Sequence, residues 1–297
     1  MKFLQVGGSH ARNEEFMKRS CQKFGIEYHH THSTDFPDHN YDIIWSPGSW
    51  VNPDNYPMSK FIFGPQFWIV PDSNHPFFTQ SKPEHADRCI FTGLSDWVIP
   101  LYNEFVDLSK SNIPFLPLPF GLDIQESSKS ELEYDCIIYV KRRHPSLIEY
   151  AKSILEANSL RYRIFTYGSY DRTDYINTLR KTRFVLWIGS HESQGFGVQE
   201  CLATGTPILV YDVNSMKDEC DHGYFTYAHL PQKMLATTVP YWDSRCGMIV
   251  KTNQEFTDTL GIFLENLDVF RPSDYIKETL PDEICFRRFL TALKLTL

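Results

Sequence analysis

The sequence predicts an α/β protein with two domains, each built on a mostly parallel, doubly wound β-sheet. Three observations support this fold class. The 297 residues suit two domains of about 100–150 residues each. A hydrophobic content of 42% and an aromatic content of 15% supply enough apolar side chains for two cores. Short apolar runs also alternate with helical patterns along most of the chain, as strands and helices do in doubly wound sheets.

The first third of the chain contains several predicted strands and helices. Apolar runs predict strands at residues 3–6, 42–46, 60–63 and 88–93. One face of a helix between the first two strands is formed by Phe16, Met17, Ser20, Cys21 and Phe24. Gly25 is expected to close this helix. Another helix is expected to begin near Ser95, because serine is a common N-cap residue.

A second series of strands and helices follows a proline-rich stretch at 114–123 and a polar stretch at 125–133. We therefore place a domain boundary between residues 124 and 125. The predicted strands of this series are 136–140, 163–167, 184–187 and 207–211. Its predicted helices are 145–157, 173–181 and 198–204, with helical stretches near the end at 275–278 and 284–295. Both halves are thus predicted to be Rossmann-like, with a ligand cleft between them or at the carboxyl ends of the strands.

Charge and cysteine usage narrow the class of protein. A net charge of −8 argues against nucleic acid as a partner, because nucleic-acid binding requires a basic surface. No secretory leader and no membrane span are expected, since no sufficiently long apolar run occurs. The seven cysteines are scattered, odd in number and form no Cys-x-x-Cys pair. This pattern favours free thiols in a reducing compartment, and the sequence therefore predicts a cytoplasmic protein.

The segment between Glu192 and Glu200 has the residue types that bind a sugar nucleotide. It contains Gly195 and Gly197 and leads into a predicted helix. Such a glycine turn presents unpaired N–H groups and the positive end of the helix dipole to a diphosphate, and Gly195 has no Cβ to obstruct it. Carboxylates are strong acceptors, so Glu200 suits ribose hydroxyls and Glu192 suits hydroxyls of the sugar. The alternative is a pair of solvated charges beside an ordinary strand-to-helix turn.

The residues around this segment resemble a known family. Residues 190–207 resemble the glutamate-x7-glutamate motif of GT-B glycosyltransferases. Residues 118–123 are similar to the Pro-x-Gly-x-Asp segment that enters the donor domain of that family. Residues 139–143 are similar to the end of the first strand of that domain, where the family keeps its basic diphosphate ligands. These matches cover about a third of the chain. Residues 63–67 and 239–247 also resemble compact glycosyltransferases of large DNA viruses, which implies a viral protein in the host-cell cytoplasm.

The resemblance implies a GT-B fold, in which two Rossmann-like domains face each other across a cleft. It implies an acceptor-side domain at 1–124, a nucleotide-sugar-binding domain at 125–270, and C-terminal helices at 271–297 that cross back to the N-terminal domain. The donor-binding residues that it implies in the motif are Glu192, Ser193, Gln194, Gly195, Phe196, Gly197 and Glu200. GT-B enzymes generally use no metal, and the sequence has no Asp-x-Asp pair for a divalent ion. We therefore expect no cofactor and a nucleotide sugar as co-substrate, with UDP favoured by the family.

Three contiguous basic residues, Lys141, Arg142 and Arg143, follow the predicted strand 136–140. Doubly wound sheets bind ligands at the carboxyl ends of their strands, so we expect these residues to neutralise the departing diphosphate. The family keeps its arginine and lysine several residues apart, and adjacent residues on an extended stretch point to opposite sides. One or two of the three are thus expected to face the phosphates. A solvated loop is the alternative.

Two further turns are candidate parts of the donor site. Tyr167, Gly168 and Ser169 end the predicted strand 163–167 and match the loop near the base in the resembled family. A tyrosine there stacks on the base, although an ordinary strand-to-helix turn is an equal alternative. Gly8 lies in the turn after the first strand, where it would approach the donor or the acceptor. That turn is not a Gly-x-Gly-x-x-Gly fingerprint, which argues against a dinucleotide-dependent dehydrogenase.

These observations predict an enzyme that transfers a sugar from a nucleoside-diphosphate sugar to a hydroxyl of a glycan, glycoprotein or other acceptor. Glu192 and Lys141 are candidate catalytic residues. The motif is typical of retaining enzymes. An inverting enzyme needs a general base near the acceptor hydroxyl, for which Asp72 is the first candidate and His75 the second. The alternatives are a sugar-nucleotide epimerase and a non-catalytic nucleotide-sugar-binding protein.

Overall fold

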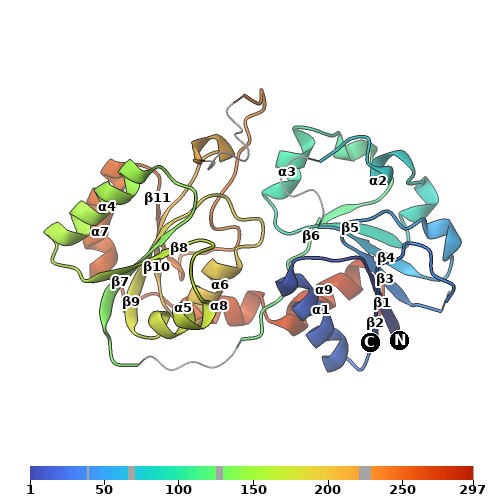
Figure 1. Cartoon of the computed structure of the whole chain (residues 1–297), viewed down its shortest axis with the longest axis horizontal. Coiled ribbons are helices and arrows are strands. Elements are labelled where there is room, and N and C mark those ends of the chain that lie inside the picture. The colour runs from blue at the N-terminus through green and yellow to red at the C-terminus, as the bar shows by residue number, and fades with distance from the viewer. Residues whose placement is uncertain (39, 66–70, 125–129, 221–228, 297) are drawn as a thin grey trace. The chain divides into compact units, whose positions relative to one another are not determined.

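The computed structural model describes residues 1–38, 40–65, 71–124, 130–220 and 229–296. Residues 66–67 of the virus-like segment and 125–129 of the predicted linker lie outside this part. The chain divides into two compact units (Figure 1). The first contains Met1–Asp123 and Leu280–Leu297, and the second contains Ile124–Thr279. Each unit is built on a parallel sheet with helices, which confirms the predicted α/β class.

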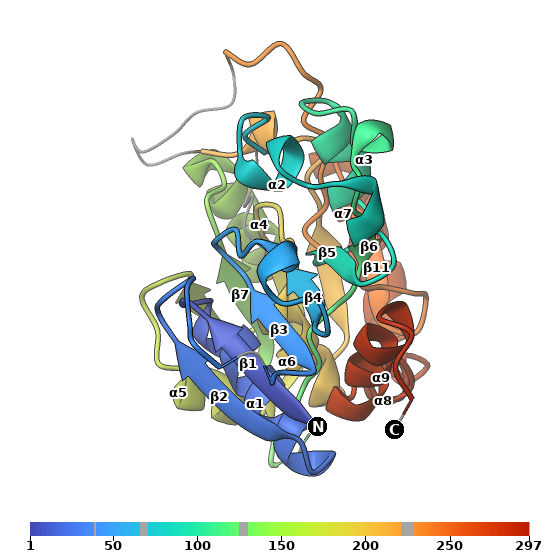
Figure 2. The same ribbon diagram turned by 90° about the vertical axis from the view of Figure 1, so that its right-hand side faces the viewer.

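The sheet of the first unit has the strand order β2-β1-β3-β4-β5-β6 in its described residues (Figure 2). These strands are β1 Lys2–Val6, β2 Glu27–Thr31, β3 Ile43–Ser46, β4 Lys60–Phe63, β5 Cys89–Gly93 and β6 Phe115–Pro117. The inner strands β3 and β5 are buried along their whole length, as expected for strands that helices cover on both faces. The strand order reverses at β1, because β2 lies on one side of it and β3 on the other.

Helices cover both faces of this sheet. They are α1 Ala11–Lys23, α2 Pro76–Thr79, α3 Val98–Asn103 and α9 Asp282–Ala292, with short 3-10 turns η1 Pro53–Asn55, η2 Pro83–His85 and η3 Leu108–Lys110. On one face, Phe16 of α1 packs against Phe286 and Phe289 of α9, with ring centroids 6.3 and 6.1 Å apart. Arg19 and Asp282 add an ion pair of 2.7 Å between the same helices. Helices α2 and α3 pack on the other face (Figure 1).

The sheet of the second unit has the order β11-β10-β9-β7-β8 in its described residues. Its strands are β7 Tyr134–Val140, β8 Tyr162–Thr166, β9 Thr182–Ile188, β10 Ile208–Tyr211 and β11 Gly247–Val250. Its helices are α4 Pro145–Ala157, α5 Arg172–Leu179, α6 Phe196–Ala203, α7 Asn253–Glu265 and α8 Pro272–Thr279, with a 3-10 turn η4 Met216–Asp218. Helices α4 and α7 cover one face. The strand order reverses at β7, which has β8 on one side and β9 on the other.

Some elements differ from those that the sequence predicts. The strands β2, β6 and β11 were not predicted, and all three lie at sheet edges. An edge strand need not carry a continuous apolar run, and β2 reads Glu-Tyr-His-His-Thr. Helix α7 was not predicted either. The helix expected near Ser95 begins instead at Val98, because Ser95 is buried in the preceding turn, where its carbonyl accepts the N–H of Val98 at 3.2 Å.

Three properties of the described residues bear on function. No helix among them is both long enough and apolar enough to cross a membrane. All seven cysteines lie in this part of the chain as free thiols, and only Cys220 is not fully buried. Within the same ranges, no three side chains of histidine, cysteine, aspartate or glutamate come together in a group that could hold a metal ion.

Candidate functional site

The carboxyl ends of β7 and β9 bring together two segments that the sequence singled out. β7 ends at Val140 and leads into residues 141–143, whereas β9 ends at Ile188 and leads through 189–195 into α6. Val140 lies opposite Ile188 in the sheet, and the N–H of Lys141 donates to the carbonyl of Ile188 at 3.0 Å. The basic turn and the glutamate segment therefore lie side by side. They do so where the strand order reverses, which is the place where open α/β sheets bind their ligands.

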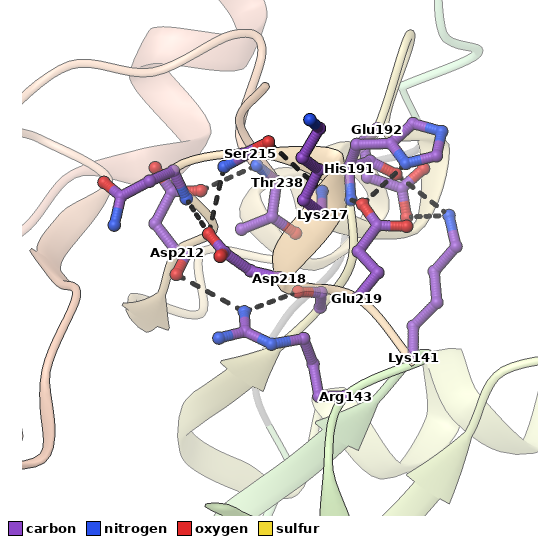
Figure 3. A network of polar contacts seen from close by, with 12 residues as sticks. Lys141, Arg143, His191, Glu192, Asp212, Ser215, Lys217, Asp218, Glu219 and Thr238 are labelled. Atoms are coloured by element: carbon purple, nitrogen blue, oxygen red, sulfur yellow. Dashed lines mark hydrogen bonds and ion pairs between the residues drawn. The ribbon is translucent and has the colours of Figure 1, made fainter. Parts of the chain in front are cut away.

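An ion pair joins these two segments (Figure 3). Nζ of Lys141 lies 2.7 Å from Oε1 of Glu192, and the two side chains are only 9% and 17% exposed. The same Nζ donates to the carbonyl of His191 at 3.3 Å and lies 4.6 Å from the ring centroid of Tyr167. The ammonium is thus held by a carboxylate, a carbonyl and an aromatic face. Its positive charge has a fixed position at the end of the sheet.

The other two basic residues take different positions from Lys141. Arg142 is exposed and has a left-handed φ of 50°. Arg143 is buried, and burial lowers its pKa. Its Nη1 donates to the carbonyls of Gly189, Tyr211 and Asp212 at 2.9, 3.0 and 3.3 Å. The guanidinium of Arg143 therefore joins the ends of β9 and β10 through their main-chain carbonyls.

Helix α6 begins directly after this turn, with Gly195 as its N-cap. Gly195 has a φ of 76°, in the left-handed region that favours glycine, and no side chain caps the helix here. A Cβ at this position would lie 3.3 Å from Cδ of Pro240. The first N–H groups of an α-helix have no partners within the helix, and they carry the positive end of its dipole. This end of α6 is therefore suited to a phosphate.

The residues between Glu192 and α6 brace the turn. Gln194 is buried, and its main-chain carbonyl accepts from Nε2 of Gln199 at 2.6 Å. This bond spans from the turn to the middle of α6 and fixes the angle at which the helix begins. Ser193 and Phe196 are half-buried on either side of the turn.

A cluster of three aromatic side chains, Tyr139, Trp187 and Tyr170, supports the first turn of α6. Tyr139 of β7 stacks on Trp187 of β9 with ring centroids 3.8 Å apart, and its hydroxyl lies 3.4 Å from that of Tyr170. Burial raises the pKa of Tyr139, so its hydroxyl stays protonated. A Cβ at Gly197 would lie 3.2 Å from Trp187 and 3.8 and 3.9 Å from the hydroxyls of Tyr139 and Tyr170. The absence of a side chain at Gly197 thus allows α6 to pack closely on this aromatic cluster.

Glu200 lies in the second turn of α6, with a side chain that is 9% exposed. Its Oε1 accepts from Nε of Arg172, the first residue of α5, at 2.8 Å. Arg172 is 61% exposed, so the ion pair joins a buried carboxylate to a guanidinium at the protein surface. Arg172 could not be predicted from the sequence, because one basic residue in a polar turn resembles any solvated charge. Hydroxyl donors that bind Glu200 would share its carboxylate with this guanidinium.

The turn after β8 belongs to the same end of the sheet. Tyr167 is 50% exposed, and its ring lies under the ammonium of Lys141. Gly168 has a φ of 78°, and the N–H of Ser169 closes the turn by donating to the carbonyl of Thr166 at 3.0 Å. The half-exposed ring of Tyr167 therefore lies beside the ion pair.

Three candidate residues, Gly8, Asp72 and His75, lie in the first unit. Gly8 follows β1, where that sheet reverses its strand order, and an added Cβ there would meet no atom within 4 Å. Asp72 is exposed, and its Oδ1 accepts the N–H of Asn74 at 2.9 Å. The carbonyl of Asp72 accepts the N–H of His75 at 3.0 Å. His75 caps α2 by accepting from Phe77 at 3.2 Å, and burial lowers the pKa of His75. Gly8, Asp72 and His75 thus belong to the first unit, whereas the cluster around Lys141 belongs to the second.

The loop after β10 contributes residues that the sequence did not indicate (Figure 3). Oε1 of Glu219 accepts both the main-chain N–H and the Nδ1 of His191 at 2.7 Å. Asp212 accepts the N–H of Thr238 at 2.7 Å and the hydroxyl of Thr237 at 3.1 Å, and burial raises the pKa of Asp212. In the sequence these acidic residues belong to a charged stretch that is typical of a solvated loop. In the folded chain, however, the side chains of Glu219 and Asp212 are buried.

Comparison with known proteins identifies the fold. No protein-family model matches the chain, and no curated protein matches its sequence. AviGT4, a glycosyltransferase involved in avilamycin A biosynthesis, is similar with a TM-score of 0.59 at 12% identity, over 99% of this chain and 97% of that one. The lipopolysaccharide outer core galactosyltransferase WaaB gives 0.58 at 12% identity, over 99% of both chains. This chain has the GT-B fold.

A third similar structure, TarM, extends beyond this chain. The TM-score is 0.51 at 14% identity over 84% of this chain, which covers only 54% of TarM. The chain therefore spans about half the length of TarM. At these identities the GT-B likeness shows the fold alone, because one fold carries many activities. The function must be argued from the residues at the end of the second sheet.

Proposed function

We propose that this GT-B chain is a glycosyltransferase that moves a sugar from a nucleoside-diphosphate sugar to a hydroxyl of a glycan or other acceptor. The observation that carries the proposal is the 2.7 Å ion pair of Lys141 and Glu192 beside the glycine-capped start of α6. The pair lies where a doubly wound sheet binds its ligand. It offers a cation for phosphate and a carboxylate for sugar hydroxyls in one place.

In this proposal the diphosphate binds at Gly195 and the first N–H groups of α6, next to Lys141 and Arg142. These groups neutralise the charge that develops as the sugar–phosphate bond breaks. The ammonium is already held in position by its contacts, so little reorganisation accompanies the reaction. Glu192 accepts from hydroxyls of the transferred sugar while it positions Lys141. By analogy with glycoside hydrolysis, the transition state resembles an oxocarbenium ion.

The nucleoside extends along the same end of the sheet. Glu200 accepts from the ribose hydroxyls, and the exposed ring of Tyr167 stacks on the base beside Gly168 and Ser169. UDP-sugars are the favoured donors, on the resemblance of the motif to GT-B enzymes. The positive charge comes from Lys141, Arg142 and the helix N-terminus, and we therefore propose that transfer needs no metal.

Calorimetric titration tests the proposal. The chain is titrated with UDP, GDP and ADP in the presence of a chelator, and we expect sub-millimolar binding of at least one of them. A Lys141→Ala variant should bind it more weakly. Donor turnover is then followed by nucleotide release with and without acceptor sugars. Failure to bind any of the three nucleotides would contradict the proposal, as would an epimerised nucleotide sugar without transfer, or tight binding without any turnover.

The stereochemistry of transfer decides the role of Asp72. If the product has the inverted configuration, Asp72 is our candidate for the general base, and Asp72→Asn should lower transfer about 100-fold or more while leaving UDP affinity unchanged. If the configuration is retained, Asp72→Asn should transfer like the wild type. NMR of the product anomer gives the configuration. An inverting enzyme with an active Asp72→Asn variant would remove Asp72 as the base.

A further inference from the structure

Glu219 is a carboxylate beside the donor site to which the proposed chemistry gives no role. Its side chain is 3% exposed, and burial of a carboxylate is unfavourable unless donors satisfy it. Oε1 accepts the main-chain N–H of His191 at 2.7 Å and the imidazole Nδ1 at 2.7 Å (Figure 3). One oxygen atom thus fixes both the backbone and the ring of a single residue. A carboxylate only accepts, so this contact requires the Nδ1–H tautomer of the ring.

His191 directly precedes Glu192, so this contact bears on the central ion pair. The carbonyl of His191 accepts from Lys141 at 3.3 Å, and the N–H of Glu192 donates to the carbonyl of Thr237 at 3.0 Å. The peptide units on both sides of His191 are therefore held in place. This arrangement directs the carboxylate of Glu192 at Lys141, 2.7 Å away. Loss of the acceptor at Glu219 would release the first of these peptide units.

The segment that carries Glu219 is itself anchored to the basic turn. The N–H of Cys220 donates to the carbonyl of Arg142 at 2.8 Å. Asp218 closes the preceding turn by accepting two main-chain N–H groups at 3.1 Å. The negative charge of Glu219 also acts on the buried guanidinium of Arg143 and opposes the effect of burial on its pKa. Glu219 therefore bridges the turn after β7 and the segment after β9.

We infer that Glu219 is a positioning residue of the donor site, which holds Lys141 and Glu192 where a β-phosphate and its sugar bind. The inference rests on the proposed function and deepens the description of the same site. Glu219 acts through Oε1 as an acceptor and does not touch the substrate. Loss of a group that orients a metal ligand typically costs about 10- to 100-fold in affinity or activity, and we expect an effect of similar size where the oriented group binds phosphate.

UDP and UMP are the probes that separate positioning from general destabilisation. UMP keeps the base, the ribose and the α-phosphate, whereas UDP adds the β-phosphate that Lys141 is proposed to bind. We expect Glu219→Ala to weaken UDP about 10- to 100-fold and UMP less than about threefold. Glu219→Gln keeps an acceptor oxygen at the same chain length, and should therefore bind UDP within about threefold of the wild type.

A second pair of variants tests the other partner of the contact. Asparagine carries an amide donor near the position of Nδ1, so His191→Asn should retain UDP affinity, whereas His191→Ala should lose it as Glu219→Ala does.

Asp135→Ala is the matched control. Asp135 accepts the N–H of Arg161 at 3.0 Å with a side chain that is 18% exposed. It lies near the start of β7, at the opposite end of the strand from Lys141, and its removal should leave the ratio of UDP to UMP affinity unchanged.

Each outcome decides the inference. Unchanged UDP affinity in Glu219→Ala, equal loss of UDP and UMP, or a Glu219→Gln variant as weak as Glu219→Ala would overturn the positioning role. Thermal unfolding shows whether each variant is folded at the titration temperature, and the two His191 variants decide the matter if Glu219→Ala does not fold. A wild-type chain that binds no nucleoside diphosphate rejects the proposed function itself, and the inference with it.

Discussion

The phosphate contact that we propose at the start of α6 depends on Gly195. Its φ of 76° lies in the left-handed region, which costs an alanine roughly 1–2 kcal/mol, and a Cβ would lie 3.3 Å from Pro240. We therefore expect Gly195→Ala to lower the free energy of unfolding by about 1–2 kcal/mol and to weaken UDP binding. Urea unfolding and calorimetric titration measure the two effects.

Gly261 supplies the matched control for that variant. It lies inside α7, where an added Cβ would meet nothing within 4 Å. Gly261→Ala should therefore raise the free energy of unfolding by roughly 0.5–1 kcal/mol, since alanine is the better helix former. If both variants changed stability in the same direction, strain at Gly195 would not be the cause of its effect.

The ribose contact proposed for Glu200 gives a second prediction. Glu200→Ala should weaken UDP binding by roughly 1–3 kcal/mol, because hydrogen bonds to a buried carboxylate are lost. The same variant should lose the ability to discriminate UDP from 2′-deoxy-UDP, and titration of both nucleotides measures this. Arg172→Gln removes the competing guanidinium and leaves the carboxylate, so it should preserve that discrimination. Equal affinity of Glu200→Ala and the wild type would exclude the ribose role.

Single residues were predictable from the sequence only where a local pattern marked them. Glu192 and Lys141 were indicated because one lies in a glycine-rich turn and the other follows an apolar strand. Glu219 was not, because its partner His191 is 28 residues away in the chain, and the charged residues around it resemble a solvated loop. The buried position of Arg143 also could not be read from the sequence, since three adjacent basic residues carry no sign of which one turns inward.

At the scale of elements, the sequence predicts the strands inside the two sheets and the edge strand β8, but it misses three other edge strands. β3, β4 and β9 are apolar along most of their length and were predicted within two residues of their observed ends. β2, β6 and β11 lie at sheet edges; β2 has no continuous apolar run, and the three residues of β6 lie within a proline-rich stretch. These strands form because they pair with a neighbouring strand of the sheet, and a local sequence pattern carries no information about that neighbour.

The contact between the short turns η1 and η2 has a predictable pH dependence. Hydrogen bonds from Lys82 and His85, the latter at 3.0 Å, lower the pKa of Asp54 to about 2. The folded state thus binds the proton less tightly than the unfolded state does. The contact should stabilise the fold at pH values above about 4, and this contribution should disappear as the pH falls towards 2. Asp54 is partly exposed, so the effect is small.

The prediction from this contact concerns Asp54→Asn. The variant should be less stable than the wild type at pH 6, and the difference should shrink as the pH is lowered from 4 to 3. Urea unfolding at each pH measures it. Asp258→Asn serves as the control, because this exposed carboxylate on α7 accepts from an uncharged partner, Nε2 of Gln254, at 2.8 Å. A stability difference for Asp54→Asn that does not change with pH would contradict the assignment.

At the scale of the whole molecule, the alternation of strands and helices was enough to predict two doubly wound units, and the fold class is confirmed by the sheets and by the GT-B likeness. The pattern alone could not show to which unit the final helices belong. The structure places α8 in the second unit and α9 in the first. The apolar face of α9 is complementary to α1, which lies more than 250 residues earlier, and sequence periodicity does not specify such a partner.

The packing of α9 on the first unit is tested through Phe289. Its side chain is fully buried and packs against Phe16 and Phe120 with ring centroids 6.1 and 5.5 Å apart. Phe289→Ala should destabilise the first unit by about 3–5 kcal/mol, and hydrogen exchange in α1 measures this loss. Arg288→Ala on the exposed side of α9 should change stability by less than about 0.5 kcal/mol. If exchange in α1 were the same in both variants, α9 would not stabilise the first unit through this aromatic contact.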